Sequence, residues 1–254
     1  MHHTLYSLFL SLAIAVLTDW LLTVQNLKHR IAYGALWILF TINLFINIGR
    51  AGQLLFFVLL MIVLIRHYKV TLFSVITTLV LLGGIFVAAF TLSPQFKHKM
   101  ELTQKNLSHI NYNTSLGARI GLDIVAKDIV NQHPLFGVGI GDYLSEKVKM
   151  VDEKYPKRVY VRFLVHYHNQ YAEFAVIAGI LGLFSYILLL FSIGRQPIRD
   201  NHIQTLKYLF LTLFMLSSLI DAMFHLSRPL SLFALFVGIV LAQHRIETEK
   251  TVTQ

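Results

Sequence analysis

Residues 166–173, His-Tyr-His-Asn-Gln-Tyr-Ala-Glu, gather several ionisable and polar side chains. A histidine can accept and return a proton near neutral pH, so His168 is the first candidate for general acid–base chemistry. Asn169 and Glu173 follow in the first turns of an expected helix, where Glu173 is close enough in sequence to orient the imidazole. The same residues could instead form a belt of tyrosine and histidine at the membrane–water interface, with no catalytic role. A zinc site is a weaker one, because His166 and His168 are only two ligands.

Two arginines could bind an anion. Arg50 follows an apolar stretch, and its forked guanidinium suits a lipid-linked phosphate or pyrophosphate. Arg119 lies in an apolar-patterned segment and could be a second cation at the same anion. Together they could neutralise a diphosphate leaving group without a metal, and no acidic metal cluster is visible. The alternatives are an arginine that reaches lipid headgroups and a solvated charge.

Three glycines, Gly137, Gly139 and Gly141, alternate with apolar residues before Asp142. They lack the spacing of a dinucleotide-binding turn, and no Lys-Ser/Thr follows, so a nucleotide site is not expected. The glycines permit a tight backbone path that could expose amides to an anion. Farther along, Asp221 and His225 are one helical turn apart at the expected end of an apolar helix. They either join the same outer cavity or form a local ion pair.

The composition indicates a membrane protein. Of the 254 residues, 56% are hydrophobic and 14% are charged, with a mean hydropathy of +0.62, which lies outside the range of soluble domains. Disorder is excluded by the hydrophobicity, and a disulfide scaffold by the absence of cysteine. The net charge of +9 fits membrane topology and affinity for anionic lipid, because no basic run is interleaved with stacking aromatics. Membrane lipid is therefore an expected partner, and nucleic acid is not.

The elements that must position these residues are apolar helices. We expect an all-α polytopic membrane protein with about seven transmembrane helices and one large loop. The expected spans are 4–24, 31–49, 51–65, 70–92, 172–194, 206–222 and 229–243. The loop, 93–171, holds most of the charge, and residues 1–254 form a single membrane domain.

Short connections set the orientation. Nine lysines and arginines fall on one side of the expected helices, against Arg50 and Arg228 in the short loops opposite. The positive-inside rule places the nine in the cytoplasm and the 93–171 loop outside. The first helix then starts outside and carries Asp19, which is costly in lipid unless it faces protein or water. Both points lead us to expect that earlier helices are absent.

Within the large loop, 114–132 shows apolar residues at helical spacing, with Ser115 as the expected N-cap. We expect an amphipathic helix that lies on the outer membrane–water boundary and ends at His133-Pro134. Residues 146–162 are charged, and we expect them to be exposed.

The motifs together resemble the O-antigen ligase/polymerase superfamily. His168-Asn169, nine residues, then Gly179-Ile180-Leu181-Gly182 resembles its His-Asn…Gly-x-x-Gly pattern, although the two glycines read alone indicate close helix packing. Upstream, Arg50, Arg119 and the Pro-Leu-Phe-Gly-Val-Gly-Ile-Gly run occur in the family's order, over about residues 40–190. One departure is Gly49, where the family often has serine.

The resemblance implies glycan transfer at the periplasmic face of the bacterial inner membrane, without nucleotide, metal or other cofactor. An O-antigen glycan on undecaprenyl pyrophosphate would pass to a hydroxyl of the lipid A core oligosaccharide, with inversion. By analogy, His168 would activate the hydroxyl, and Arg50 and Arg119 would bind the pyrophosphate. We expect the remaining substrate contacts from Asn169, Gly137, Gly139, Gly141, Glu173 and Asp221.

Other functions stay open. An O-antigen polymerase and a protein O-oligosaccharyltransferase share these motifs. A transporter would show polar residues at the midplane of several spans, whereas here the outer-face residues dominate. A non-catalytic remnant that binds lipid-linked glycan is the last alternative.

Overall fold

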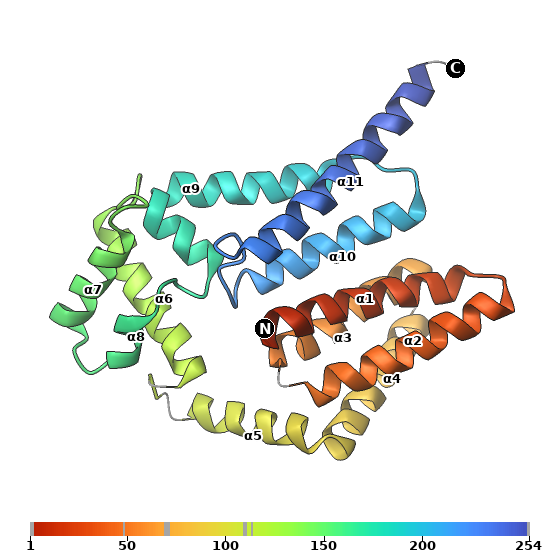
Figure 1. Cartoon of the computed structure of the whole chain (residues 1–254), viewed down its shortest axis with the longest axis horizontal. Coiled ribbons are helices and arrows are strands. Elements are labelled where there is room, and N and C mark those ends of the chain that lie inside the picture. Colours follow the sequence, from red (N-terminus) through yellow and green to blue (C-terminus); the bar gives the residue numbers. More distant parts are fainter. Residues whose placement is uncertain (1–2, 48, 69–71, 109–110, 113, 253–254) are drawn as a thin grey trace. The chain divides into compact units, whose positions relative to one another are not determined.

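The computed structural model describes residues 3–47, 49–68, 72–108, 111–112 and 114–252, and the regular elements in these ranges are all helices, with no strand (Figure 1). This confirms the all-α class. The helices are α1 (His3–Thr23), α2 (Leu27–Ile46), α3 (Arg50–His67), α4 (Leu72–Leu92), α5 (Pro94–Ser108), α6 (Ser115–Gln132), α7 (Tyr143–Lys154), α8 (Val159–Phe163), α9 (Gln170–Arg195), α10 (Asn201–Ser217) and α11 (Ser227–Val252).

Five of the described helices, α1, α2, α3, α9 and α11, are long and apolar enough to cross a membrane. The protein is therefore a multi-pass membrane protein. The two other expected spans are also helical, as α4 and α10. Helix α10 has 17 residues and ends at Ser217, so the expected continuation to residue 222 is wrong. The chain leaves the helix there and forms an irregular segment, residues 218–226, that carries Asp221 and His225.

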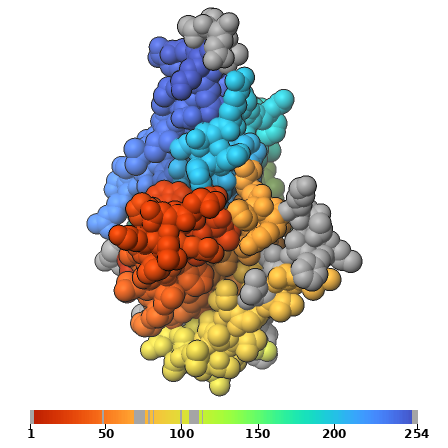
Figure 2. Space-filling model, turned by 90° about the vertical axis from the view of Figure 1, so that its right-hand side faces the viewer, coloured from red at the N-terminus to blue at the C-terminus, as the bar shows by residue number. Residues whose placement is uncertain are grey.

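The chain divides into two compact units. The first unit comprises 1–101, 196–213 and 236–254, and the second comprises 102–195 and 214–235. In the first unit, α1 packs against α2 and α3, and residues of α1 and α2 form one continuous surface in red and orange (Figure 2). The ring of Phe45 meets Phe56 and Phe96 edge-on, with centroids 5.6 and 5.5 Å away. Apolar side chains of α1 to α5 thus build one core.

Two polar features of the first unit have structural explanations. The carboxylate of Asp19 lies 2.7 Å from Nδ1 of His202, so this acidic residue of α1 has a partner within the protein, as its cost in lipid requires. Gly49 occupies a position where a Cβ atom would come within 2.2 Å of Oγ of Ser7. The close approach of α1 therefore leaves no room for a side chain at this position.

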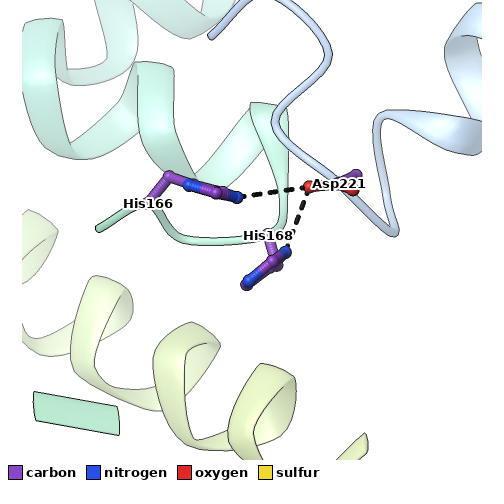
Figure 3. Close-up of side chains that lie close together, drawn as sticks. All are labelled: His166, His168 and Asp221. Atoms are coloured by element: carbon purple, nitrogen blue, oxygen red, sulfur yellow. Dashed lines mark hydrogen bonds and ion pairs between the residues drawn. The ribbon is translucent and has the colours of Figure 1, made fainter. Parts of the chain in front are cut away.

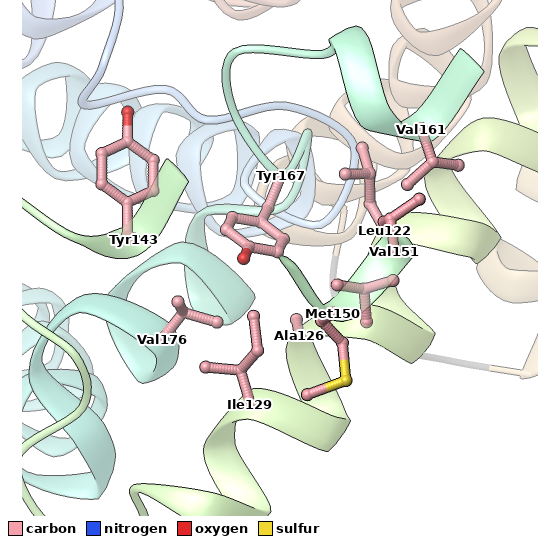
Figure 4. Close-up of a cluster of buried hydrophobic side chains, with 10 residues drawn as sticks. Leu122, Ala126, Ile129, Tyr143, Met150, Val151, Val161, Tyr167 and Val176 are labelled. Carbon is pink, nitrogen blue, oxygen red and sulfur yellow. The ribbon is translucent and has the colours of Figure 1, made fainter. Parts of the chain in front are cut away.

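In the second unit, the apolar face of α6 is buried by protein (Figure 4). Leu122, Val125 and Ile129 are fully buried against residues of α7, α8 and α9. The expectation that this face lies on the membrane boundary is therefore wrong: apolar periodicity indicates a buried face but not what buries it. The N-cap is Thr114, whose Oγ1 accepts from the amide of Gly117, and not Ser115.

Helix α7 also corrects an expectation. Residues 146–162 are not uniformly exposed, because α7 buries three of them, Lys147, Met150 and Val151. The ammonium of Lys147 donates to the carbonyl of Leu164. Burial lowers the pKa of this lysine to about 8. The second unit therefore has its own core, from which the segment that carries His168 extends.

Candidate functional site

His168 and Asp221 form the centre of the site (Figure 3). Nδ1 of His168 lies 3.0 Å from Oδ1 of Asp221, although 53 residues separate them in the chain. His168 adopts a φ of +50°, and it is the only non-glycine with a positive φ among the described residues. Such a backbone costs free energy and persists where the surrounding contacts impose it. The local fold thus holds the imidazole against Asp221.

The protonation of this pair follows from its surroundings. Burial alone would raise the pKa of Asp221, but hydrogen bonds from His166 and His168, together with their charges, outweigh it and lower the pKa below its ordinary value. The ionised carboxylate can only accept, and it also accepts from the amide of Ala222 at 3.0 Å. Nδ1 of His168 must therefore carry the proton. In the neutral imidazole the other ring nitrogen, Nε2, is then the unprotonated atom, and in the imidazolium it carries the second proton.

A second histidine–carboxylate pair supports the first. Glu173 is buried, its Oε2 accepts from the amide of Tyr167 at 3.1 Å, and its Oε1 lies 3.0 Å from Nδ1 of His225. The ring of His166 stacks on His225 with centroids 5.4 Å apart and lies 4.2 Å from the ring of His168. Glu173 thus orients the backbone beside His168 and not the imidazole itself.

Of the two alternatives for Asp221 and His225, the local ion pair is not formed: Asp221 pairs with His168, before α9, and His225 pairs with Glu173 of α9. Gln170, the first residue of α9, holds this arrangement. Its backbone amide donates to the carbonyl of Ser218 at 2.7 Å, and its side-chain oxygen accepts from the backbone amide of Phe224 at 2.6 Å. Both ends of the 218–226 segment are therefore attached to the start of α9.

Helix α6 contributes Arg119 and Asp123, which are four residues apart and hence on one helical face. Nε of Arg119 donates to the carbonyl of Ile220 at 3.0 Å, and Nη1 donates to Oγ of Ser115 at 3.1 Å. Ile220 precedes Asp221 directly, so the guanidinium is held beside the segment that carries the central carboxylate. Two of the three expected catalytic residues, His168 and Arg119, are thus in one local arrangement.

Asn169 connects the same face of α6 to the segment that carries His168. Its Nδ2 donates to Oδ1 of Asp123 at 2.9 Å, and its Oδ1 accepts from the amides of Tyr171 and Ala172. The side chain therefore caps α9 at its N-terminus. This is a positioning role, and the predicted contact of Asn169 with substrate stays a prediction.

Gly137 and Gly179 allow the 134–141 loop, residues Pro134 to Gly141, to dock on α9. Gly179 breaks α9 with a φ of +64°, and a Cβ atom there would lie 2.2 Å from the carbonyl oxygen of Leu135. Gly137 has a φ of +65°, and its Cβ would lie 2.3 Å from the carbonyl oxygen of Val176. Gly179 therefore interrupts the helix for this loop, which differs from the helix–helix packing that its sequence pattern indicates.

Because α9 is interrupted at Gly179, carbonyl groups of the preceding turn accept hydrogen bonds from the loop. The amides of Val138 and Gly139 donate to the carbonyls of Val176 and Ile177, both at 2.9 Å, and the amide of Gly137 donates to the carbonyl of His133 at 3.1 Å. These three amides are engaged within the protein, so they do not form the anion site that the glycines suggested. A substrate contact at Gly139 or Gly141 stays a prediction.

Arg50 belongs to the first unit, where it is the first residue of α3 and follows Gly49. The amide of Gly49 donates to Oδ1 of Asn47 at 3.1 Å. The prediction that Arg50 binds pyrophosphate is not tested by this local geometry and stays a prediction.

Three of the described side chains could hold a metal ion. The ligand atoms of His166, His168 and Asp221 all lie within 4.8 Å of one another, and two histidines with a carboxylate can bind zinc and leave a position for water. The same atoms are already joined by hydrogen bonds to the carboxylate. The prediction of a metal-free site stays a prediction.

The sequence did not indicate the observed partners of His166 and His225, and it assigned no role to Gln170 or Asp123. His166 and Gln170 belong to the polar 166–173 run, which marked this segment as a candidate site. The sequence did not indicate which residues they contact. Asp123 is four residues after Arg119 and shares its helical face. Nothing in the sequence around His225 indicates a bond to Glu173.

The comparison with known families supports the sequence resemblance. The profile of the O-antigen ligase family matches residues 34–187, which is more than half of the chain. The chain belongs to the O-antigen ligase family. Members of this family are membrane glycosyltransferases of the ligase and polymerase type, they act on lipid-linked glycans, and they are found in the bacterial inner membrane. No curated protein matches the chain significantly.

The matched range contains Arg50, Arg119, the three glycines, His168, Asn169 and Glu173. Asp221 and His225 lie beyond it. The structure brings these two residues to the part of the second unit that carries the family's histidine.

Proposed function

We propose that this protein is an O-antigen ligase that transfers a glycan from undecaprenyl pyrophosphate to a hydroxyl of the lipid A core oligosaccharide. The observation that carries the proposal is the pair of His168 and Asp221 at 3.0 Å. An ionised carboxylate behind Nδ1 leaves Nε2 to accept a proton and stabilises the imidazolium that results. This is the arrangement that a sugar hydroxyl needs in order to become a nucleophile.

The transfer forms one bond and breaks one at the anomeric carbon, and it moves one proton. As the acceptor oxygen bonds to the anomeric carbon, its proton passes to Nε2 of His168. The bond between the anomeric carbon and the phosphate oxygen breaks, and the electron pair leaves with undecaprenyl pyrophosphate. Attack opposite the leaving group inverts the anomeric centre. The donor already carries an activated leaving group, so the scheme uses no nucleotide and no metal.

Arg119 is the proposed partner of the leaving group. Its guanidinium is held by the carbonyl of Ile220 and by Ser115, so its charge is fixed before the substrate binds. A preorganised cation stabilises the negative charge that develops on the pyrophosphate without a cost of reorganisation. A second contribution from Arg50 is proposed from the family pattern alone.

The site is proposed to face the periplasm. Nine lysines and arginines of the short connections lie on the side of the expected spans opposite Arg50 and Arg228. The positive-inside rule places those nine in the cytoplasm. The second unit's helices α6, α7 and α8, and with them His168, then lie on the periplasmic side.

Complementation of a ligase-deficient Gram-negative strain that makes a lipid-linked O-antigen tests the proposal. Wild type and His168→Ala are compared at equal membrane expression, with polymer-bearing lipopolysaccharide read on a gel. His133→Ala is the matched control, since His133 is an exposed histidine in the same unit. We expect ladders from wild type and the control only. Longer lipid-linked polymer without lipopolysaccharide ladders would instead identify a polymerase and refute the ligase proposal.

A further inference from the structure

The 134–141 loop has an apolar surface that the proposed chemistry does not use. It carries no charged residue, and three of its large side chains are exposed: Leu135 by 57%, Phe136 by 74% and Ile140 by 78%. These are among the most exposed hydrophobic side chains described for the second unit. A water-facing loop of this length would normally carry polar side chains instead.

The loop is attached to a helix that is long and apolar enough to cross the membrane. The amides of Val138 and Gly139 bond to α9 at residues 176 and 177, and the amide of Ile180 bonds to the carbonyl of Pro134, each at 2.9 Å. On α9 itself, Ile180, Leu181 and Phe184 are exposed by half or more. The exposed side chains of the loop therefore continue the apolar exposed surface of a membrane-spanning helix.

The level of the loop along α9 can be estimated. A helix rises about 1.5 Å per residue and the hydrocarbon core is about 30 Å thick, so about 20 residues span it. From the break at Gly179 to Arg195, the last residue of α9, the helix rises about 24 Å, so if Arg195 marks one boundary, the break lies inside the other boundary of the roughly 30 Å core. The contacts of the loop at residues 176–180 then lie just inside the outer hydrocarbon boundary.

Part of the loop backbone is paired in the way that a bilayer requires. Irregular backbone is tolerated at membrane depth only where its polar groups find partners in the protein. The amides of three consecutive residues, Gly137 to Gly139, and the carbonyl of Pro134 are bonded within the protein. The part of the loop that is attached to α9 therefore has backbone partners within the protein, and the exposed large side chains around it are apolar.

We infer that the 134–141 loop inserts into the outer leaflet of the bilayer, with Leu135, Phe136 and Ile140 against lipid acyl chains. The partner is the lipid bilayer itself, and the loop fixes the second unit at the membrane surface. This inference does not depend on which glycan is transferred, because it concerns only the loop and α9.

The chain contains no cysteine, so single cysteines can be labelled without background. Phe136→Cys and Ile140→Cys, each in the full chain, are labelled with bimane and reconstituted into nanodiscs. Two quenchers are compared: phosphatidylcholine brominated within an acyl chain, and aqueous iodide. Leu181→Cys is the control for a lipid-exposed site, and Lys149→Cys, on an exposed side chain of α7, is the control for water.

We expect brominated lipid to quench the labels at 136 and 140 to at least half the extent seen at 181, with iodide quenching several-fold weaker than at 149. Iodide quenching equal to that at 149 would overturn the inference, because the loop would then face water. Quenching by neither reagent would also overturn it, because protein would then cover the loop. The measurement needs no transfer activity, so it stands apart from the test of the ligase.

Discussion

The substitution Asp221→Asn tests how much the buried carboxylate contributes to transfer. Asparagine has nearly the same shape and can still accept from the amide of Ala222, so the 218–226 segment should keep its conformation. The change removes the charge that lies 3.0 Å from Nδ1 of His168. It also introduces an amide that can donate, which favours the tautomer with the proton on the wrong nitrogen.

The magnitude follows from this distance. Two unit charges 3.0 Å apart attract by about 1 kcal/mol in water and by about 5 kcal/mol at the effective dielectric constant of about 20 that suits protein sites. The site is partly exposed, so we take about 3–4 kcal/mol as the loss of stabilisation of the imidazolium. At about 1.4 kcal/mol per tenfold, this predicts a transfer rate about 10²- to 10³-fold lower.

The assay is transfer by the purified full chain in nanodiscs, with donor and acceptor at saturation. Asp19→Asn is the matched control, because it removes the charge of the histidine-paired Asp19 in the first unit, where Oδ2 lies 2.7 Å from His202. It should leave the rate unchanged. A rate for Asp221→Asn within threefold of wild type would refute the reasoning, provided that both variants melt at the wild-type temperature.

Three further predictions concern the second unit. Gly179→Ala should lower the free energy of unfolding by more than about 2 kcal/mol, because the new Cβ atom would lie 2.2 Å from a backbone carbonyl oxygen. Thermal melting measures this change. The control Gly141→Ala should change it little, because a Cβ atom there meets nothing within 4 Å. The pKa of Lys147 is lowered to about 8, so the folded state loses its proton first, and stability should rise from about pH 8 to about pH 10.5. Lys147→Met should abolish this rise and gain up to about 3 kcal/mol at neutral pH; a wild-type slope in the variant would contradict this. Arg119→Lys keeps the charge but loses the fork that donates to the carbonyl of Ile220, so the transfer rate should fall about tenfold to 100-fold; wild-type kinetics would count against this role.

Several features of the fold could be predicted from the sequence because they depend on local pattern. Apolar stretches of sufficient length identified the five spanning helices, and the capped segment before residue 132 identified α6. The extent of α10 could not be predicted, because Leu219, Ile220 and Ala222 continue the apolar pattern of the helix. The bonds from Gln170 to Ser218 and Phe224 hold that segment out of the helix, and they come from a distant part of the chain.

The candidate site also has one part that local sequence predicts and one part that it does not. His168 and Asn169 are adjacent and form a recognisable pattern, whereas Asp221 and Glu173 each pair with a histidine more than 50 residues away. No local periodicity encodes such a pairing. The apolar face of α6 was identified correctly as a face, but hydrophobicity does not distinguish lipid from a protein core, and here it is α7, α8 and α9 that cover it.

The central claim is that His168 removes the proton from the acceptor hydroxyl during glycan transfer. The most direct measurement is the release of undecaprenyl pyrophosphate by purified wild type and His168→Ala, with and without lipid A core acceptor, alongside donor binding. We predict acceptor-dependent release by wild type, a rate at least about 10²-fold lower in the variant, and equal donor binding by both. Acceptor-dependent release by the variant at the wild-type rate would contradict the account.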